Sequence, residues 1–149
     1  MSRATLTRPM LLAAAAFTAA GGFVHGREWL VDYRDVPAAA PGSWLVRIGF
    51  PVNAGLSVLL VIALVLVALR LPRFAVPVAL GVAGFQAGTL ALVIATRTGT
   101  VFGWTEPVWT RGADQSRAVA IGALLVLGAA AALHVVGRAT PRRPVPATA

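Results

Sequence analysis

Residues 48–69 read IGFPVNAGLSVLLVIALVLVAL, a run of 22 uncharged residues between Arg47 and Arg70. A helix of about 20 residues is long enough to cross the roughly 30 Å hydrocarbon core of a bilayer. A lone segment in lipid must be helical, because only a helix pairs its backbone N–H and C=O groups within the segment. The stretch therefore predicts a transmembrane helix.

Three further uncharged intervals occur, each bounded by arginines. They hold 18 residues between Arg8 and Arg27, 23 between Arg73 and Arg97, and 20 between Arg117 and Arg138. We expect spans at about 9–26, 50–69, 75–96 and 118–137, so residues 1–139 are predicted to form an all-α bundle of four antiparallel transmembrane helices. The first interval also fits a cleaved signal peptide. Its length and the poor cleavage site at 18–20 favour a span.

The composition suits lipid as the solvent. Hydrophobic residues make up 58% of the chain and charged residues 12%, and the mean hydropathy is +0.79. An average soluble domain has about 25% charged residues. The net charge of +8 comes from arginines that punctuate apolar runs, which argues against nucleic acid as a partner. With no cysteine, the chain has no disulfide and no thiolate site.

The distribution of charge predicts the orientation. One set of segments holds seven arginines and no acid: Arg3, Arg8, Arg70, Arg73, Arg138, Arg142 and Arg143. The other set holds six arginines and all five acids: Glu28, Asp32, Asp35, Glu106 and Asp114. Cytoplasmic loops are rich in Arg and Lys. Seven arginines against six barely separate the two sets, but the short turn with Arg70 and Arg73 and the triply basic tail make the first set the denser one. We therefore expect both termini in the cytoplasm, with 140–149 as a disordered basic tail. Abundant Arg without Lys suggests a high-GC bacterium, and hence the plasma membrane.

Aromatic residues gather in the two predicted outer loops. These loops hold all four tryptophans and the one tyrosine: Trp29, Tyr33, Trp44, Trp104 and Trp109. Amphipathic rings favour both membrane interfaces, so a distribution confined to one side is informative. The rings either anchor the protein at that interface or form a cap over the outer end of the bundle.

Polar residues inside the spans lean to the same side. His25, Asn53 and Gln86 lie within predicted spans, and Glu106 lies in the second outer loop. Polar groups in hydrocarbon are costly unless paired and often mark function. We therefore predict an outward-facing polar pocket built from these four residues, with interhelical hydrogen bonds that only fix packing as the alternative. His134 lies near the opposite face from His25, so we expect no haem or metal shared by the two histidines.

Glycine and proline positions add local expectations. Gly22 with Gly26, and Gly84 with Gly88, are spaced four residues apart, which lets membrane helices approach closely. Such pairs indicate packing inside the bundle or a homodimer face. Pro51 is expected at the start of the second helix, where a missing N–H has little effect.

Several motifs resemble a group of small four-helix membrane proteins of high-GC bacteria to which no activity is assigned. They are GFVH at 22–25, YRDVP at 33–37, GFPVNA at 49–54, GT at 88–89, RTG at 97–99 and FGWTE at 102–106. The resemblance covers the first three spans and both outer loops. It implies four spans and draws attention to the same His, Asn and Glu, and it implies no cofactor.

The favoured function is non-enzymatic: binding of a partner protein or a small ligand at the extracytoplasmic face. One alternative is a subunit of a homo-oligomeric transporter or channel, since four helices enclose little pore. Another is a membrane enzyme acting on a lipid or quinone, with His25 and Glu106 as acid and base. The expected partners are the lipid bilayer and either a membrane protein or further copies of the chain.

Overall fold

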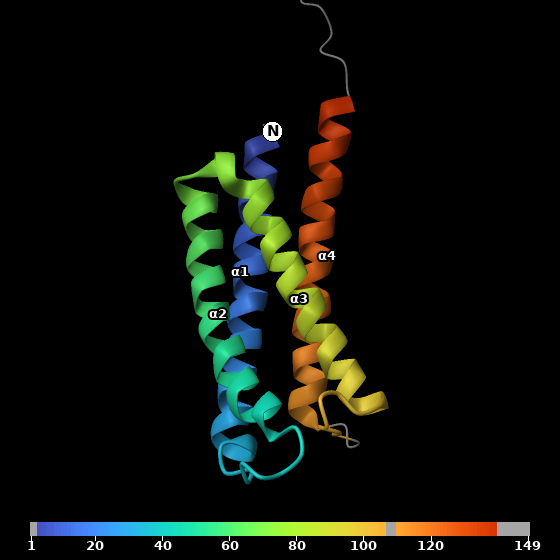
Figure 1. Cartoon of the computed structure of the whole chain (residues 1–149). Coiled ribbons are helices and arrows are strands. Elements are labelled where there is room, and N and C mark those ends of the chain that lie inside the picture. Colours follow the sequence, from blue (N-terminus) through green and yellow to red (C-terminus); the bar gives the residue numbers. More distant parts are fainter. Residues whose placement is uncertain (1–2, 107–109, 140–149) are drawn as a thin grey trace, which may run out of the picture.

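The structure, a computed structural model, describes residues 3–106 and 110–139. Its described part contains four long helices: α1 (Arg3–Glu28), α2 (Ser43–Leu69), α3 (Ala75–Thr98) and α4 (Arg111–Ala139), shown in Figure 1. Each of them is long and apolar enough to cross a membrane. The predicted all-helical fold with four helices of spanning length is therefore confirmed. Trp109 and the predicted tail at 140–149 lie outside the described residues.

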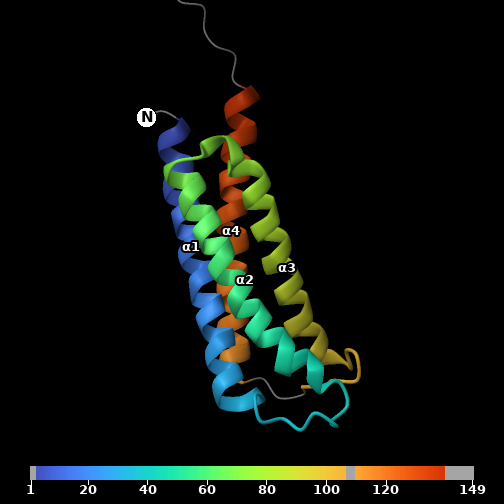
Figure 2. The same cartoon turned by 60° about the vertical axis from the view of Figure 1, so that its left-hand side comes forward.

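The connections place the polar segments at opposite ends of the bundle. A short 3₁₀ turn, η2 (Pro72–Phe74), joins α2 to α3. It lies at the same end as the start of α1 and the end of α4, as Figures 1 and 2 both show. We call this the turn end. The loop at 34–42 and the segment at 99–106 lie at the other end, which we call the loop end.

The helices extend beyond the predicted spans into the expected loops. α2 begins at Ser43 and α4 at Arg111, so each contains the predicted span and about two further turns at the loop end. Arg47 and Arg117 mark the limits of the apolar runs, but charge does not end a helix. At the loop end, the described residues outside the long helices and the turn of π-helix that follows α1 are 34–42, 99–106 and Thr110.

Pro51 lies inside α2, not at its start, so the sequence-based expectation was wrong. A proline cannot donate the helical hydrogen bond to the carbonyl four residues earlier, here that of Arg47. The indole Nε1–H of Trp29 donates to the Arg47 carbonyl at 3.0 Å instead. A side chain from the neighbouring helical segment therefore replaces the missing backbone donor.

The turn-end half of the bundle is a dry core. Its buried cluster comes from all four helices: Leu11, Ala14, Ala15, Leu64, Val67, Val82 and Leu127. Large apolar side chains on the outside remain exposed, among them Leu59, Leu80 and Leu125 at 63%, 67% and 69%. Soluble monomers rarely expose extended apolar surface of this kind, whereas lipid accepts it without penalty.

α1 packs closely against both α2 and α4. A methyl group at Gly22 would lie 2.6 Å from Ser57 Cβ on α2, and one at Gly122 would collide with the ring of Phe17. Gly26 lies beside Ala54 at ordinary contact distance. The Gly22 and Gly26 pair therefore serves packing inside the bundle.

Candidate functional site

A partly open cavity of about 310 Å³ lies in the loop-end half of the bundle. All four helices and the segment at 99–106 contribute to its lining. Three residues of the predicted pocket line it, namely His25, Asn53 and Glu106. The cavity lies beyond the dry core, so the bundle is divided into an apolar half and a half with polar groups in its interior.

Gln86, the fourth residue of the predicted pocket, does not line the cavity. It is buried, and its Nε2 donates to Thr18 Oγ1 at 3.2 Å. The Thr18 hydroxyl in turn donates to the carbonyl of Ala14 at 2.8 Å. Gln86 therefore links α3 to α1, which is the interhelical hydrogen bonding that the alternative interpretation described.

His25 is a buried titratable residue of α1, with 6% of its surface exposed. Its ring meets the Phe50 ring edge to face, with centroids 5.1 Å apart. Its Nδ1 is buried and has no hydrogen-bond partner among the described residues. An imidazole nitrogen left in this way is open to a water molecule or a ligand.

Asn53 joins α2 to α3 at the deeper side of the cavity. Its Nδ2 donates to Thr89 Oγ1 at 2.9 Å, and both residues line the cavity. The Asn53 side chain also carries a carbonyl oxygen, which is a hydrogen-bond acceptor. The pair thus fixes the spacing of the two helices and supplies polar atoms to the wall.

Glu106 is fixed in the cavity lining by hydrogen bonds to two other segments of the chain. The Tyr33 hydroxyl donates to Glu106 Oε2 at 3.0 Å, and the backbone N–H of Glu106 donates to the Thr96 carbonyl at 2.8 Å. Tyr33 is buried at the end of η1 (Trp29–Tyr33), a turn of π-helix that continues α1. Because a π-turn closes over five residues, Tyr33 returns to the face of Glu28.

Glu28 is a cavity residue that the sequence analysis did not single out. Only 4% of its surface is exposed, and its carboxylate lies against α4, where any side chain at Gly112 would collide with it. Arg97 also lines the cavity and attracts the Glu28 carboxylate. The signal was present in the sequence: Glu28 follows His25 by three residues, which places both side chains on one helical face.

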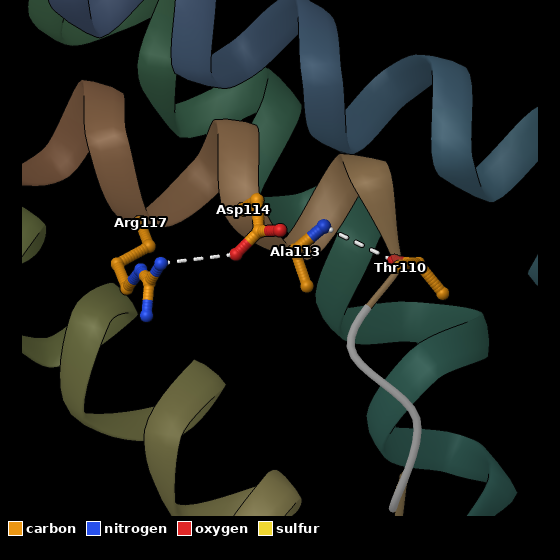
Figure 3. A network of polar contacts seen from close by, with 4 residues as sticks. All are labelled: Thr110, Ala113, Asp114 and Arg117. Carbon is orange, nitrogen blue, oxygen red and sulfur yellow. Dashed lines mark hydrogen bonds and ion pairs between the residues drawn. The ribbon is translucent and has the colours of Figure 1, made fainter.

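Negative charge at Glu28 suits its position beside the first turn of α4, where helix N–H groups lack backbone partners. Figure 3 shows this start of α4, with Thr110 Oγ1 accepting a hydrogen bond from the Ala113 N–H at 3.1 Å. Asp114 and Arg117 pair at 3.1 Å on the exposed side of the same helix and do not line the cavity.

The predicted aromatic residues separate into two groups. Tyr33 and Trp104 line the cavity, with ring centroids 6.4 Å apart. Trp29 and Trp44 line a separate shallow hollow beside Arg47, and Trp44 is half exposed against the exposed Phe102 ring at 5.3 Å. The first group lies at the cavity, whereas in the second group Trp44 is exposed and Trp29 is only partly exposed.

The two loop-end segments pack against each other. Gly42 has φ of +67° and Gly103 has φ of +86°, both in the left-handed region that favours glycine. A side chain at Gly42 would collide with the backbone of Gly103 and Trp104. This close approach fixes the segment that carries Trp104 and Glu106 over the end of the bundle.

Gly84 and Gly88 have a different role from the first glycine pair. Both line the cavity, and a methyl group at either position would meet nothing within 4 Å among the described residues. Both are exposed, so the cavity is open on this side of α3. Their small size leaves space here and does not bring helices together within the described chain.

Comparison with protein families, curated proteins and solved structures found no match to this chain. The fold and the site of the described residues therefore define the class by themselves: a bundle of four helices long and apolar enough to cross a membrane, with a cavity that contains polar groups in one half. The resemblance to small four-helix membrane proteins of high-GC bacteria stays a prediction.

Proposed function

We propose that this chain is a multi-pass protein of the bacterial plasma membrane that binds a small ligand in the loop-end cavity. In this proposal the helices are antiparallel, both termini are cytoplasmic, and the loop end faces the extracytoplasmic side. The charges support it: the turn between α2 and α3 carries Arg70 and Arg73 with no acid, whereas all five acids of the chain lie toward the loop end.

The main observation in support of this proposal is that one cavity is lined by residues that are far apart in the sequence, namely His25, Asn53 and Glu106. Its volume of about 310 Å³ lies at the lower end of the roughly 300–1,000 Å³ typical of small-molecule sites. A small ligand fits better than a partner protein, because His25 and Glu28 are too deeply buried to meet a protein surface.

Two other functions remain distinguishable by experiment. A transporter or channel requires a path through the membrane, but the described turn-end half is filled by the dry core, so an oligomer would have to supply it. A membrane enzyme acting on a lipid or quinone is consistent with His25 and Glu106 lining the same cavity. Solute flux in liposomes would favour the first, and turnover of an added lipid or quinone the second.

The binding proposal is tested by native mass spectrometry of the protein purified in mild detergent. We expect a bound small molecule on the wild type and its loss in Gly49→Leu, which places a side chain in the cavity where a methyl group meets nothing within 4 Å. Gly55→Leu is the matched control, because it lies on the same helix, is equally uncrowded and does not line the cavity.

Retention of the same adduct by Gly49→Leu would place binding elsewhere. The proposed function would be contradicted if the wild-type protein carried no adduct and also bound none of three added amphiphiles with a cationic, a neutral and an anionic head.

A further inference from the structure

Two buried polar groups of the cavity have no hydrogen-bond partner among the described residues: His25 Nδ1 and Ser116 Oγ. Both residues line the cavity, and their exposed fractions are only 6% and 2%. They also share one layer of the bundle, because Gly21 contacts Val119 on one side of them and Glu28 contacts Gly112 on the other. Buried polar groups are normally satisfied, so this layer indicates a polar ligand.

The charges of the lining indicate the sign of that ligand. Among the described lining residues, Glu28 and Glu106 are the carboxylates and Arg97 is the guanidinium. With both acids ionised, this lining carries one more negative than positive charge, and Arg27 and Asp32, which act on Glu28 from outside it, offset each other in sign. An unpaired charge away from water is costly unless a counter-charge or hydrogen-bond donors meet it. A ligand with a single positive charge would supply what is missing.

Aromatic rings stand beside these carboxylates. The Tyr33 ring lies 4.6 Å from the Phe50 ring and 6.4 Å from the Trp104 ring, and all three residues line the cavity. The faces of such rings attract organic cations, and quaternary ammonium groups in particular bind in aromatic surroundings. Acids and rings together thus fit an ammonium group better than a compact metal ion.

The remainder of the cavity is elongated and largely apolar. Along α3 the lining extends from Arg97 and Thr96 at the loop end to Gly84. Thr96 and Gly84 are 12 residues apart, which is roughly 18 Å at 1.5 Å per residue. Leu92 and Phe85 are among the lining residues between these points. The charged groups therefore occupy one end of the cavity, and a wall that is apolar apart from the hydrogen-bonded pair Asn53–Thr89 leads away from them.

We propose that the cavity binds an amphiphilic organic cation. Its ammonium head lies between Glu28 and Glu106 beside the aromatic rings, and its apolar chain extends toward Gly84 and Gly88. The open side at these two glycines leaves room for a chain that extends into lipid. This inference rests on the proposed binding function and specifies the ligand class for the same site.

The test uses three probes with the same alkyl chain and different heads: decylammonium, decanol and decyl sulfate. Only the first of them has a cationic head, and its N–H groups can donate hydrogen bonds to His25 Nδ1 and Ser116 Oγ. Each is titrated calorimetrically into the full chain in a neutral maltoside detergent, with protein-free micelles as the blank. We expect saturable binding of the ammonium probe at least about tenfold tighter than that of either other probe, a difference of about 1.4 kcal/mol.

Variants locate the site. Glu28→Gln and Glu106→Gln should each lower the affinity for the ammonium probe about tenfold, again about 1.4 kcal/mol. The affinity of each variant for this probe should then be close to that for decanol. Asp114→Asn is the matched control, since this acid is exposed at the same end of the bundle, pairs with Arg117 and does not line the cavity (Figure 3). Circular dichroism and gel filtration confirm folding, and Glu106, being less buried than Glu28, provides the second variant if Glu28→Gln fails to fold.

The outcomes separate the two proposals. Equal binding of all three probes, or an ammonium affinity insensitive to both Glu→Gln variants, would overturn the cation inference. If, in either case, Gly49→Leu abolished binding of the probes, the cavity would still be a ligand site, but for a ligand that is not recognised by its positive charge. Failure of the ammonium probe to bind at all overturns the cation inference, and absence of binding by every probe together with absence of a co-purified adduct overturns both.

Discussion

At the scale of single residues, Pro51 shows how a local defect is met by tertiary structure. Its missing N–H leaves the Arg47 carbonyl without its helical donor, and the Trp29 indole donates to that carbonyl at 3.0 Å. In lipid or at its interface a carbonyl without a donor is costly. The contact also ties the end of α1 to the first turns of α2, directly beside the cavity wall formed by Phe50 and Asn53.

Trp29→Phe should lower the free energy of unfolding by about 0.5–1.5 kcal/mol, the usual contribution of one hydrogen bond. In a Pro51→Ala background the same substitution should have a smaller effect, because the alanine N–H can donate to the Arg47 carbonyl. Equilibrium unfolding in mixed micelles measures both values. Equal losses in the two backgrounds would show that Trp29 stabilises the protein by packing alone.

At the scale of elements, α1 is the helix that organises the others. Its Gly22 contacts Ser57 on α2, its Phe17 contacts Gly122 on α4, and its Thr18 accepts a hydrogen bond from Gln86 on α3. The same helix continues into His25 and Glu28 in the cavity. The spacing of α1 from its neighbours therefore sets the width of the cavity.

Gly22→Ala should destabilise the protein by about 1–3 kcal/mol, as overpacking of a tight contact does. The added methyl group meets Ser57 Cβ, which moves only if α2 moves. Gly26→Ala is the control on the same contact: its methyl group would lie 3.8 Å from Ala54 Cβ, so it should be neutral or stabilise by up to about 1 kcal/mol. Thermal unfolding in detergent compares the two, and equal stability would contradict the close α1–α2 contact.

At the scale of the whole molecule, the bundle has two unlike halves. The turn-end half is dry, and the loop-end half holds the cavity, the buried Glu28 and the two loop segments packed at Gly42 and Gly103. The Gln86–Thr18 hydrogen bond lies between them. This asymmetry agrees with the asymmetry of charge along the chain, and it gives the proposed orientation a direct test.

Because the chain has no cysteine, single substitutions give clean labelling sites. Ala39→Cys and Thr100→Cys lie at exposed loop-end positions, and Leu71→Cys lies in the exposed turn. In intact bacterial cells a membrane-impermeant maleimide should label the first two, and it should label Leu71→Cys only after the membrane is permeabilised. The reverse pattern would place the cavity on the cytoplasmic side.

Three of the four residues predicted for the pocket line the cavity. His25, Asn53 and Glu106 stood out because polar residues are rare near apolar spans, and the structure brings them to one cavity. Gln86 stood out for the same reason but bonds Thr18 instead. Glu28 was missed, because a charge at the end of a span resembles an ordinary interfacial residue until its 4% exposure is known.

The sequence alone determined that the chain forms four helices of spanning length, since uncharged runs of this length must pair their backbone groups within themselves in lipid. Only the tertiary structure decided which polar groups meet, because contacts between helices depend on rotation and register, which composition does not encode. It turned Glu28 inward against Gly112, placed Pro51 within α2 and left open space beside Gly84 and Gly88. Helix formation is a local property of each run, whereas a cavity is a property of how the runs pack.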